Sequence, residues 1–254
     1  MTGTKTLDAK SGSRRIHIID ILRGIAIIYM VFFHTLFDLA YMWRYDWAIQ
    51  LFYSQLGVVL FDELTFVVLA GVCANLSRSN AERGAGILCI ALGFSAVTAF
   101  IFPGSAIYFG ILHLLSFSML IYAATEKWLT KIPWWICAAV FALLALFTWN
   151  VQNGYFGVGS LSFDVPDIFT QNNSLYPFGF IGRGFTSADY FPLFPWLFVF
   201  LAGASVGRLC RRELPEPFYK NYCPPLAFIG RHSLFIYVIH QPIIFAILYI
   251  IKPL

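Results

Sequence analysis

Charged residues are scarce in this chain of 254 residues. Asp, Glu, Lys and Arg together make up 12% of it, against about 25% in a typical soluble domain. Hydrophobic residues account for 59%, and the mean hydropathy is +0.73. This composition excludes an ordinary soluble fold and predicts an integral membrane protein. In such a protein every charge inside the bilayer is costly and therefore informative.

Cysteine is also sparse, and its spacing excludes two common frameworks. No two of the five cysteines form a CxxC pair, and three lie within apolar stretches. Neither a disulfide framework nor a zinc site is therefore expected, and we expect no metal cofactor. The five cysteines are Cys73, Cys89, Cys137, Cys210 and Cys223.

From the sequence we expect no repeat of fixed period, no soluble domain and no cleavable signal. The first apolar segment is too long for a signal peptide, is interrupted by charges and lacks a small-residue cleavage site. We therefore expect a polar, disordered cytoplasmic tail at residues 1–15, followed by a single transmembrane domain at residues 16–254.

Seven apolar stretches have about the length that crosses a bilayer. The predicted fold class is thus all-α, a polytopic membrane bundle of about seven transmembrane helices. The stretches lie near residues 16–42, 50–76, 85–103, 106–125, 133–150, 191–209 and 228–250.

The basic residues predict a cytoplasmic N-terminus. Fourteen of the 17 Lys and Arg residues fall on one side of the predicted bundle, and the positive-inside rule assigns that side to the cytoplasm. The net charge of +4 therefore reflects topology and needs no nucleic-acid partner. The fourteen are Lys5, Lys10, Arg14, Arg15, Arg23, Arg78, Arg83, Lys127, Lys131, Arg208, Arg211, Arg212, Lys220 and Arg231.

The first apolar stretch carries four ionisable residues on one face. A helix turns about 100° per residue, so residues 3, 4, 11 or 18 apart share a face. Arg23 follows Asp20 by three residues, and His34 follows Arg23 by eleven. Asp38 follows His34 by four. The four form a polar stripe, which we expect to face a protein interior or a watery cavity.

His34 is the strongest candidate for chemistry on this stripe. Asp38, one helical turn later, can accept a hydrogen bond from one ring nitrogen of His34, which leaves the other nitrogen basic. The alternative is a buried histidine that only hydrogen-bonds between helices. For Asp20 and Arg23, near the cytoplasmic end, phosphate binding and a local ion pair are equally open.

Other polar residues lie within later stretches. Asp62 and Glu63 are adjacent, so one can line a chamber while the other pairs with a neighbouring helix. His113 lies at the same predicted depth as His34. Ser233, Tyr237 and His240 share a face of the last stretch. For these three residues and for His113, the alternative to a functional role is a hydrogen bond within the protein core. Gly203 and Gly207, by contrast, form a small-xxx-small pair typical of helix packing.

The longest segment between apolar stretches, residues 151–190, is predicted to be external. It is rich in glycine and carries eight aromatic residues, which is too many for a solvated linker. We expect a folded cap whose aromatic faces suit a sugar-like acceptor; the alternative is a lid that only packs at the membrane interface. The aromatic residues are Tyr155, Phe156, Phe163, Phe169, Tyr176, Phe178, Phe180 and Phe185.

Five blocks of the sequence resemble a known family. Arg23–Gly24 and His34, in DILRGIAIIYMVFFH, resemble the Arg-x10-His signature of membrane acyltransferases. These include the acyltransferase-3 group and the heparan-α-glucosaminide N-acetyltransferase group. The chain resembles in particular compact bacterial proteins that share the catalytic domain of the latter. The resemblance continues in FDELTFVVLAGVCANLSRS, IYFGILHLLSFS, DYFPLFPWLFVFLAGASVGRL and IGRHSLFIYVIHQPIIF.

The resemblance implies transfer of an acyl group, most simply acetyl, from cytoplasmic acyl-CoA to an amino or hydroxyl group of a sugar or glycan across the membrane. The expected location is the bacterial inner membrane, in contact with lipid. The chain is shorter than the larger relatives, with seven predicted spans against about ten, which favours a homodimer.

The expected site follows from the same resemblance. His34, which matches the histidine of the acyltransferase-3 motif, would be the general base, held by Asp38; an acyl-His intermediate is the alternative route. Candidate oxyanion donors are Tyr237, His113 and His240. Candidate ligands of the coenzyme phosphates are Arg23, Arg78, Arg208 and Arg231. We expect the substrate to contact Asp62, Glu63 and Asp189.

A different class of function remains open at this point. A proton-coupled small-molecule transporter could use the stripe of Asp20, Arg23, His34 and Asp38 as a relay. The sequence has no clear inverted repeat, which such transporters commonly show. A two-haem protein is disfavoured because a second histidine pair is missing, and a retinal protein because the last stretch has no central lysine.

Overall fold

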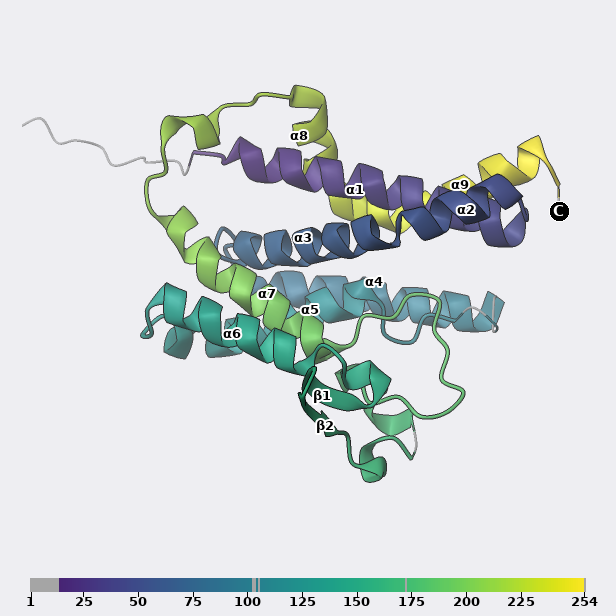
Figure 1. Cartoon of the computed structure of the whole chain (residues 1–254). Coiled ribbons are helices and arrows are strands. Elements are labelled where there is room, and N and C mark those ends of the chain that lie inside the picture. The colour runs from purple at the N-terminus through teal and green to yellow at the C-terminus, as the bar shows by residue number, and fades with distance from the viewer. Residues whose placement is uncertain (1–13, 102–103, 105, 172, 254) are drawn as a thin grey trace, which may run out of the picture. The chain divides into compact units, whose positions relative to one another are not determined.

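The structure is a computed structural model that describes residues 14–253, apart from residues 102–103, 105 and 172. It consists mainly of helices (Figure 1). These helices form two compact units. Unit 1 comprises the chain up to Asp62 together with Leu214–Leu254, and unit 2 comprises Glu63–Glu213. The predicted disordered tail lies outside the described residues except for Arg14 and Arg15.

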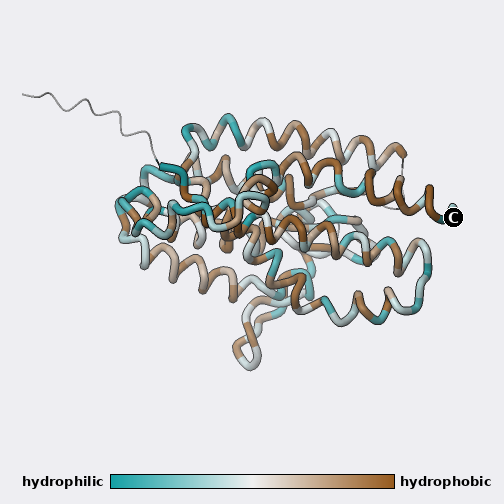
Figure 2. The backbone as a smooth tube through the Cα atoms, turned by 90° about the horizontal axis from the view of Figure 1, so that it is seen from above, coloured by the Kyte–Doolittle hydropathy of each residue, from teal (hydrophilic) through white to brown (hydrophobic). Residues whose placement is uncertain are grey.

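Unit 1 is built around the first and last long helices. The last helix, which leads to the marked C-terminus, is hydrophobic along much of its length, as Figure 2 shows by colour. A π-helical turn, η1, directly continues α1, and two shorter helices complete the unit with the first part of α3. The elements are α1 (His17–Phe37), η1 (Asp38–Met42), α2 (Asp46–Ser54), α3 (Leu56–Ala74, as far as Asp62), η7 (Glu216–Tyr219), α8 (Pro224–Arg231) and α9 (Ser233–Ile251).

Unit 2 begins within α3 and contains two further pairs of packed helices, α4 with α5 and α6 with α7. A small antiparallel hairpin lies between α6 and α7 in the chain. The elements are α4 (Asn80–Ile101), α5 (Ile111–Leu129), α6 (Trp134–Thr148), η3 (Val151–Asn153), β1 (Tyr155–Val158), β2 (Leu161–Asp164), η4 (Asp167–Phe169), η5 (Asn173–Phe178), α7 (Leu193–Gly207) and η6 (Arg208–Arg211).

Six helices of the described chain are long and apolar enough to cross a membrane. The chain is therefore a polytopic helical membrane protein, which confirms the predicted fold class. The six candidate spans are His17–Met42, Leu56–Ala74, Asn80–Ile101, Trp134–Asn153, Leu193–Arg211 and Ser233–Ile251.

The fourth predicted span, near residues 106–125, corresponds to α5, which is 19 residues long but is not among these six. It carries His113 near its start and Glu126 and Lys127 near its end, and these residues dilute its apolar character. Its first three turns are buried on most sides. A helix enclosed by protein needs less apolar surface than one that faces lipid, which explains why α5 differs from the others.

Close helix packing in unit 1 depends on two glycines. A Cβ atom at Gly24 of α1 would meet the backbone of Leu226 and Gly230 in α8. A Cβ at Gly230 would meet the carbonyl oxygen of Asp20. Because neither glycine has a side chain, the two backbones touch. This contact brings the junction between α8 and α9 against the first turns of α1.

Glycines also allow α3 and α7 to pack closely within unit 2. Cβ atoms at Gly203 and Gly207 would meet Val68 and Val72 of α3, and a Cβ at Gly71 would meet the backbone of α7. The predicted packing role of the Gly203–Gly207 pair is thus confirmed. Nearby, the buried Asn75 side chain donates to the Ala204 carbonyl at 2.7 Å.

The basic ends of two unit 2 helices lie together. The Arg208 guanidinium donates to the carbonyls of Leu129 and Ile132 at the end of α5, both at 2.9 Å. Arg211 pairs with Glu126 of the same helix. The segments that follow α5 and α7, both predicted to be cytoplasmic, therefore lie at the same end of unit 2. The orientation of the chain in the membrane stays a prediction.

The segment at residues 151–190 is folded in its described part. Strands β1 and β2 are joined by a two-residue turn, and Gly159 in this turn has a φ of 60°. Phe156 stacks on Phe147 at 5.4 Å, and Phe169 stacks on Phe180 at 5.3 Å between ring centroids. The Tyr190 hydroxyl donates to the Tyr176 carbonyl, and burial raises the pKa of this phenol. That the segment at residues 151–190 covers an external acceptor site stays a prediction.

Candidate functional site: the contact between α1 and α9

The polar stripe of α1 faces α9 at three levels. Arg23 donates to the Ser233 hydroxyl at 2.5 Å. The His34 and His240 rings lie 4.9 Å apart between centroids, at an angle of 58°. Asp38 accepts hydrogen bonds from Gln241. The prediction that these α1 residues share one face and meet protein is therefore confirmed.

Asp20, the fourth residue of the stripe, has a different partner. Its carboxylate accepts hydrogen bonds from Arg15 at 2.5 and 3.1 Å. Asp20 itself is buried, whereas Arg15 precedes α1 and is exposed. Asp20 therefore pairs with Arg15 and not, as the sequence suggested, with Arg23 on the same helix. Arg23 keeps its contact with α9.

Asp38 is fully buried and lies opposite the amide of Gln241. The Gln241 Nε2 atom is 2.9 Å from Oδ1 and 3.0 Å from Oδ2 of Asp38. The expected hydrogen bond from His34 to Asp38 is not among those made by the described residues. A carboxylate only accepts hydrogen bonds, so it directs the amide nitrogen toward itself and the amide oxygen away.

Asp38 occupies this position at a change of helix type. It is the first residue of the π-helical turn η1, and its carbonyl accepts from the Trp43 amide at 3.0 Å. A π turn widens the helix by one residue and is frequent at functional sites. The small buried residues Ala40 and Ala48 pack beside Phe52, which brings α2 against this turn.

The hydrogen bond of His240 defines its tautomer. Its Nδ1 lies 2.6 Å from the Tyr237 carbonyl oxygen, which can only accept, so Nδ1 carries the proton. In the neutral ring the Nε2 atom therefore holds a lone pair. This buried Nε2 has no hydrogen-bond partner within the described chain, and neither has the buried Oε1 of Gln241.

Unit 1 also holds three further predicted residues, Tyr237, Asp62 and Arg231. The Tyr237 ring lies 5.5 Å from the His240 ring, as expected for one helical face. Asp62 is half-buried on α3. Arg231 is exposed, with its guanidinium 5.8 Å from the Phe228 ring centroid.

Unit 2 holds the other five predicted residues. His113 is buried, with Nε2 3.4 Å from the Ser95 hydroxyl. Asp189 accepts from the Ile111 amide at 3.1 Å and so caps the start of α5. Arg208 caps the end of α5, as described above. Arg78 is exposed in the turn after α3, and Glu63 is half-buried.

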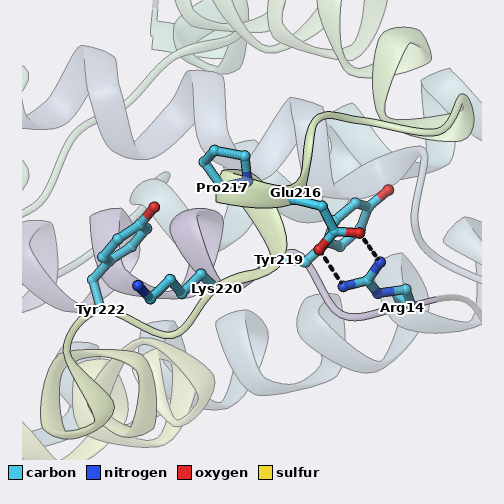
Figure 3. Close-up of a pocket in the computed structure, with 6 residues that line it drawn as sticks. All are labelled: Arg14, Glu216, Pro217, Tyr219, Lys220 and Tyr222. Carbon is cyan, nitrogen blue, oxygen red and sulfur yellow. Dashed lines mark hydrogen bonds and ion pairs between the residues drawn. The ribbon is translucent and has the colours of Figure 1, made fainter.

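A cavity of about 490 Å³ lies near the N-terminal end of α1 in unit 1 (Figure 3). The Arg14 guanidinium lies 4.4 Å from the Tyr219 ring and donates two hydrogen bonds to Glu216. This contact lowers the pKa of the Glu216 carboxyl. Lys220 lies 5.3 Å from the Tyr222 ring. The cavity combines two cations, two aromatic rings and one carboxylate that is already paired, and Pro217 completes it.

Sequence reasoning missed Gln241 and this cavity. A signal for Gln241 was present, because it is the polar neighbour of His240 in an otherwise apolar helix. The cavity had no such signal, since its residues come from two segments about 200 positions apart. Among the described residues, no group of three His, Cys, Asp or Glu side chains could hold a metal ion.

The family model for the catalytic domain of heparan-alpha-glucosaminide N-acetyltransferase matches residues 15–242. The chain belongs to this family. The match begins at Arg15, which pairs with Asp20. It includes His34 and ends in the turn of α9 that holds His240 and Gln241. No curated protein and no solved structure matches the chain. Membership of the N-acetyltransferase family implies that the chain is a membrane acetyltransferase.

Proposed function

We propose that this protein transfers an acetyl group from acetyl-CoA to an amino or hydroxyl group of a sugar or glycan. The observation that carries the proposal is the pair of imidazoles, His34 and His240, at the contact of α1 and α9. They lie within the segment matched by the N-acetyltransferase family. Two imidazoles at one site supply the proton transfers that acyl transfer requires.

In the proposed reaction, His34 removes a proton as the acceptor nitrogen or oxygen attacks the thioester carbonyl. A new carbon–nitrogen or carbon–oxygen bond forms, and the carbon–sulfur bond of acetyl-CoA breaks. The proton held by His34 then neutralises the departing thiolate. General base catalysis of this kind typically contributes about 10²–10⁴-fold to the rate.

The neighbours of the two imidazoles receive distinct roles. Asp38 acts as a positioning residue, because it holds Gln241 and with it the turn of α9 that carries His240. His240 offers a lone pair in its neutral form, so we assign it an accepting role and retain Tyr237 and His113 as candidate oxyanion donors.

The donor is proposed to approach from the N-terminal end of α1. Arg23 lies eleven residues before His34, which corresponds to about 16 Å along a helix. Arg23, Arg231 and the cations of the 490 Å³ cavity are in unit 1, and they suit the coenzyme phosphates. Arg78 and Arg208 stay candidates in unit 2.

The acceptor is proposed to bind from the external side of a bacterial cytoplasmic membrane. The folded, aromatic-rich segment at residues 151–190 supports a sugar-like acceptor. Asp62, Glu63 and Asp189 stay candidate contacts of this acceptor.

The orientation can be tested by cysteine labelling in intact cells. In a background without the five native cysteines, a membrane-impermeant maleimide should modify a cysteine placed at Gln171 and spare one at Ser79. The opposite pattern would reverse the proposed direction of acetyl transfer.

The activity is tested with purified full-length protein, radiolabelled acetyl-CoA and a panel of amino sugars. Acetyl-CoA should raise the melting temperature by mass action, and label should appear on at least one acceptor. Absence of both effects at millimolar acetyl-CoA, together with proton-coupled uptake of a small solute into proteoliposomes, would replace this proposal by the transporter.

A further inference from the structure

Two buried hydrogen-bond acceptors at the α1–α9 contact have no donor among the described residues. His240 is 8% exposed, and its Nε2 atom carries a lone pair because Nδ1–H is bonded to the Tyr237 carbonyl. The next residue, Gln241, directs its amide nitrogen to Asp38 and leaves Oε1 unpaired. Buried acceptors without donors are uncommon in proteins, and each one calls for an explanation such as a bound water, an ion or a ligand.

Both acceptors are held in place by their other bonds. Rotation of the Gln241 amide would bring its oxygen against the carboxylate of Asp38, and rotation of the His240 ring would break the bond from Nδ1. Neither side chain can therefore satisfy itself by turning over. The ring of His34 lies beside His240 but makes no hydrogen bond to its Nε2 atom.

We propose that His240 Nε2 and Gln241 Oε1 bind two donor hydrogens of the acyl acceptor. Gln241 thereby becomes a specificity-determining residue. The fitting ligand has donor groups on adjacent carbons, as in a vicinal amino alcohol or a diol. The nucleophilic group lies against the two imidazoles, and the donor on the next carbon reaches Gln241. This inference rests on the proposed function, because it assumes that the α1–α9 contact receives the acceptor.

The first test measures binding to the full-length protein in the absence of acyl-CoA, by ligand-observed NMR. The probes are trans-2-aminocyclohexanol, which has two neighbouring donors, and cyclohexylamine and cyclohexanol, which have one donor group each. The wild type should bind the two-donor probe about tenfold more tightly, as one additional hydrogen bond predicts. Equal affinities for the three probes would overturn the inference.

Variants assign this preference to Gln241. Gln241→Met removes the amide but keeps an unbranched side chain, and it should abolish the tenfold preference. The double variant Asp38→Asn with Gln241→Glu exchanges donor and acceptor between the two residues and keeps an acceptor oxygen at 241, so it should retain the preference. If Gln241→Met does not fold, loss of the preference in a folded double variant would overturn the inference.

Gln55→Met is the matched control. Gln55 is a half-buried glutamine of unit 1 whose amide is bonded to Tyr29 and Ser54, and its replacement should leave the preference unchanged. A merely structural role of Gln241 would weaken all three probes equally. A wild type that shows the preference but transfers no acetyl group would overturn the proposed function alone, whereas transfer without any preference would overturn this inference alone.

Discussion

Helix α1 in unit 1 and helix α5 in unit 2 both carry polar residues through an apolar environment, but they pair them differently. The backbone at the two ends of α5 is capped by side chains from elsewhere in the unit: Asp189 accepts from the Ile111 amide, and Arg208 donates to the Leu129 carbonyl. The stripe of α1 meets another helix at three levels, and two of these levels each leave one acceptor without a donor among the described residues.

This difference distinguishes polar residues that stabilise a helix from those that are available to a ligand. A capping residue satisfies backbone groups that no bilayer could satisfy, so its loss lowers stability. A buried acceptor without a donor has no such structural benefit. The contrast therefore predicts that changes at the ends of α5 alter folding, whereas changes on the α1 stripe alter catalysis.

The largest expected effect on stability is at Arg208. Arg208→Met removes both hydrogen bonds to the end of α5 and should lower the free energy of unfolding by about 2 kcal/mol, as expected for bonds from a charged group. Thermal melts against the exposed Arg212→Met control would measure it. An unchanged melt with a raised KM for acetyl-CoA would instead make Arg208 a coenzyme ligand.

A substitution at Asp38 should have a somewhat smaller effect in free energy, and this effect should appear in the rate of acetyl transfer. Asp38→Asn weakens the hold on the Gln241 amide and should lower kcat/KM by about tenfold, which corresponds to about 1.4 kcal/mol. Steady-state acetyl transfer would measure it, with the exposed Asp46→Asn as the control. If the melting temperature falls while the rate stays normal, the α1 stripe is structural and the contrast with α5 fails.

Asp189 should give the smallest effect. Asp189→Ala removes the acceptor for the Ile111 amide and should cost about 1 kcal/mol of stability, the usual value for a lost N-terminal cap. Asp167→Ala, at an exposed acidic residue, is the matched control. A loss of acceptor binding without a change in stability would return Asp189 to the substrate site.

Local periodicity predicted the features that depend on one helix. The face shared by Arg23, His34 and Asp38 follows from spacing alone, because every α-helix turns by the same angle. The same holds for the packing of Gly203 and Gly207, which α7 presents to a neighbouring helix. The spans were also predictable, since bilayer thickness sets their length.

Partners across the sequence could not be predicted in this way. Gln241 lies 203 residues from Asp38, and no local pattern selects it over the nearby His34. The π turn at Asp38 is a shift in backbone hydrogen bonding, which periodicity does not reveal. The short hairpin at residues 155–164 was hidden in a glycine-rich segment whose strands are only four residues long.

The central claim is that His34 is the catalytic base, and His34→Ala tests it most directly. The variant should lose at least about 100-fold in acetyl transfer, the lower end of the contribution of a general base. It should still bind acetyl-CoA, seen as an unchanged shift of the melting temperature. His232→Ala is the control, because His232 is an exposed histidine of the same unit bonded only to a backbone carbonyl among the described residues. A well-folded His34→Ala protein with wild-type transfer would contradict the account.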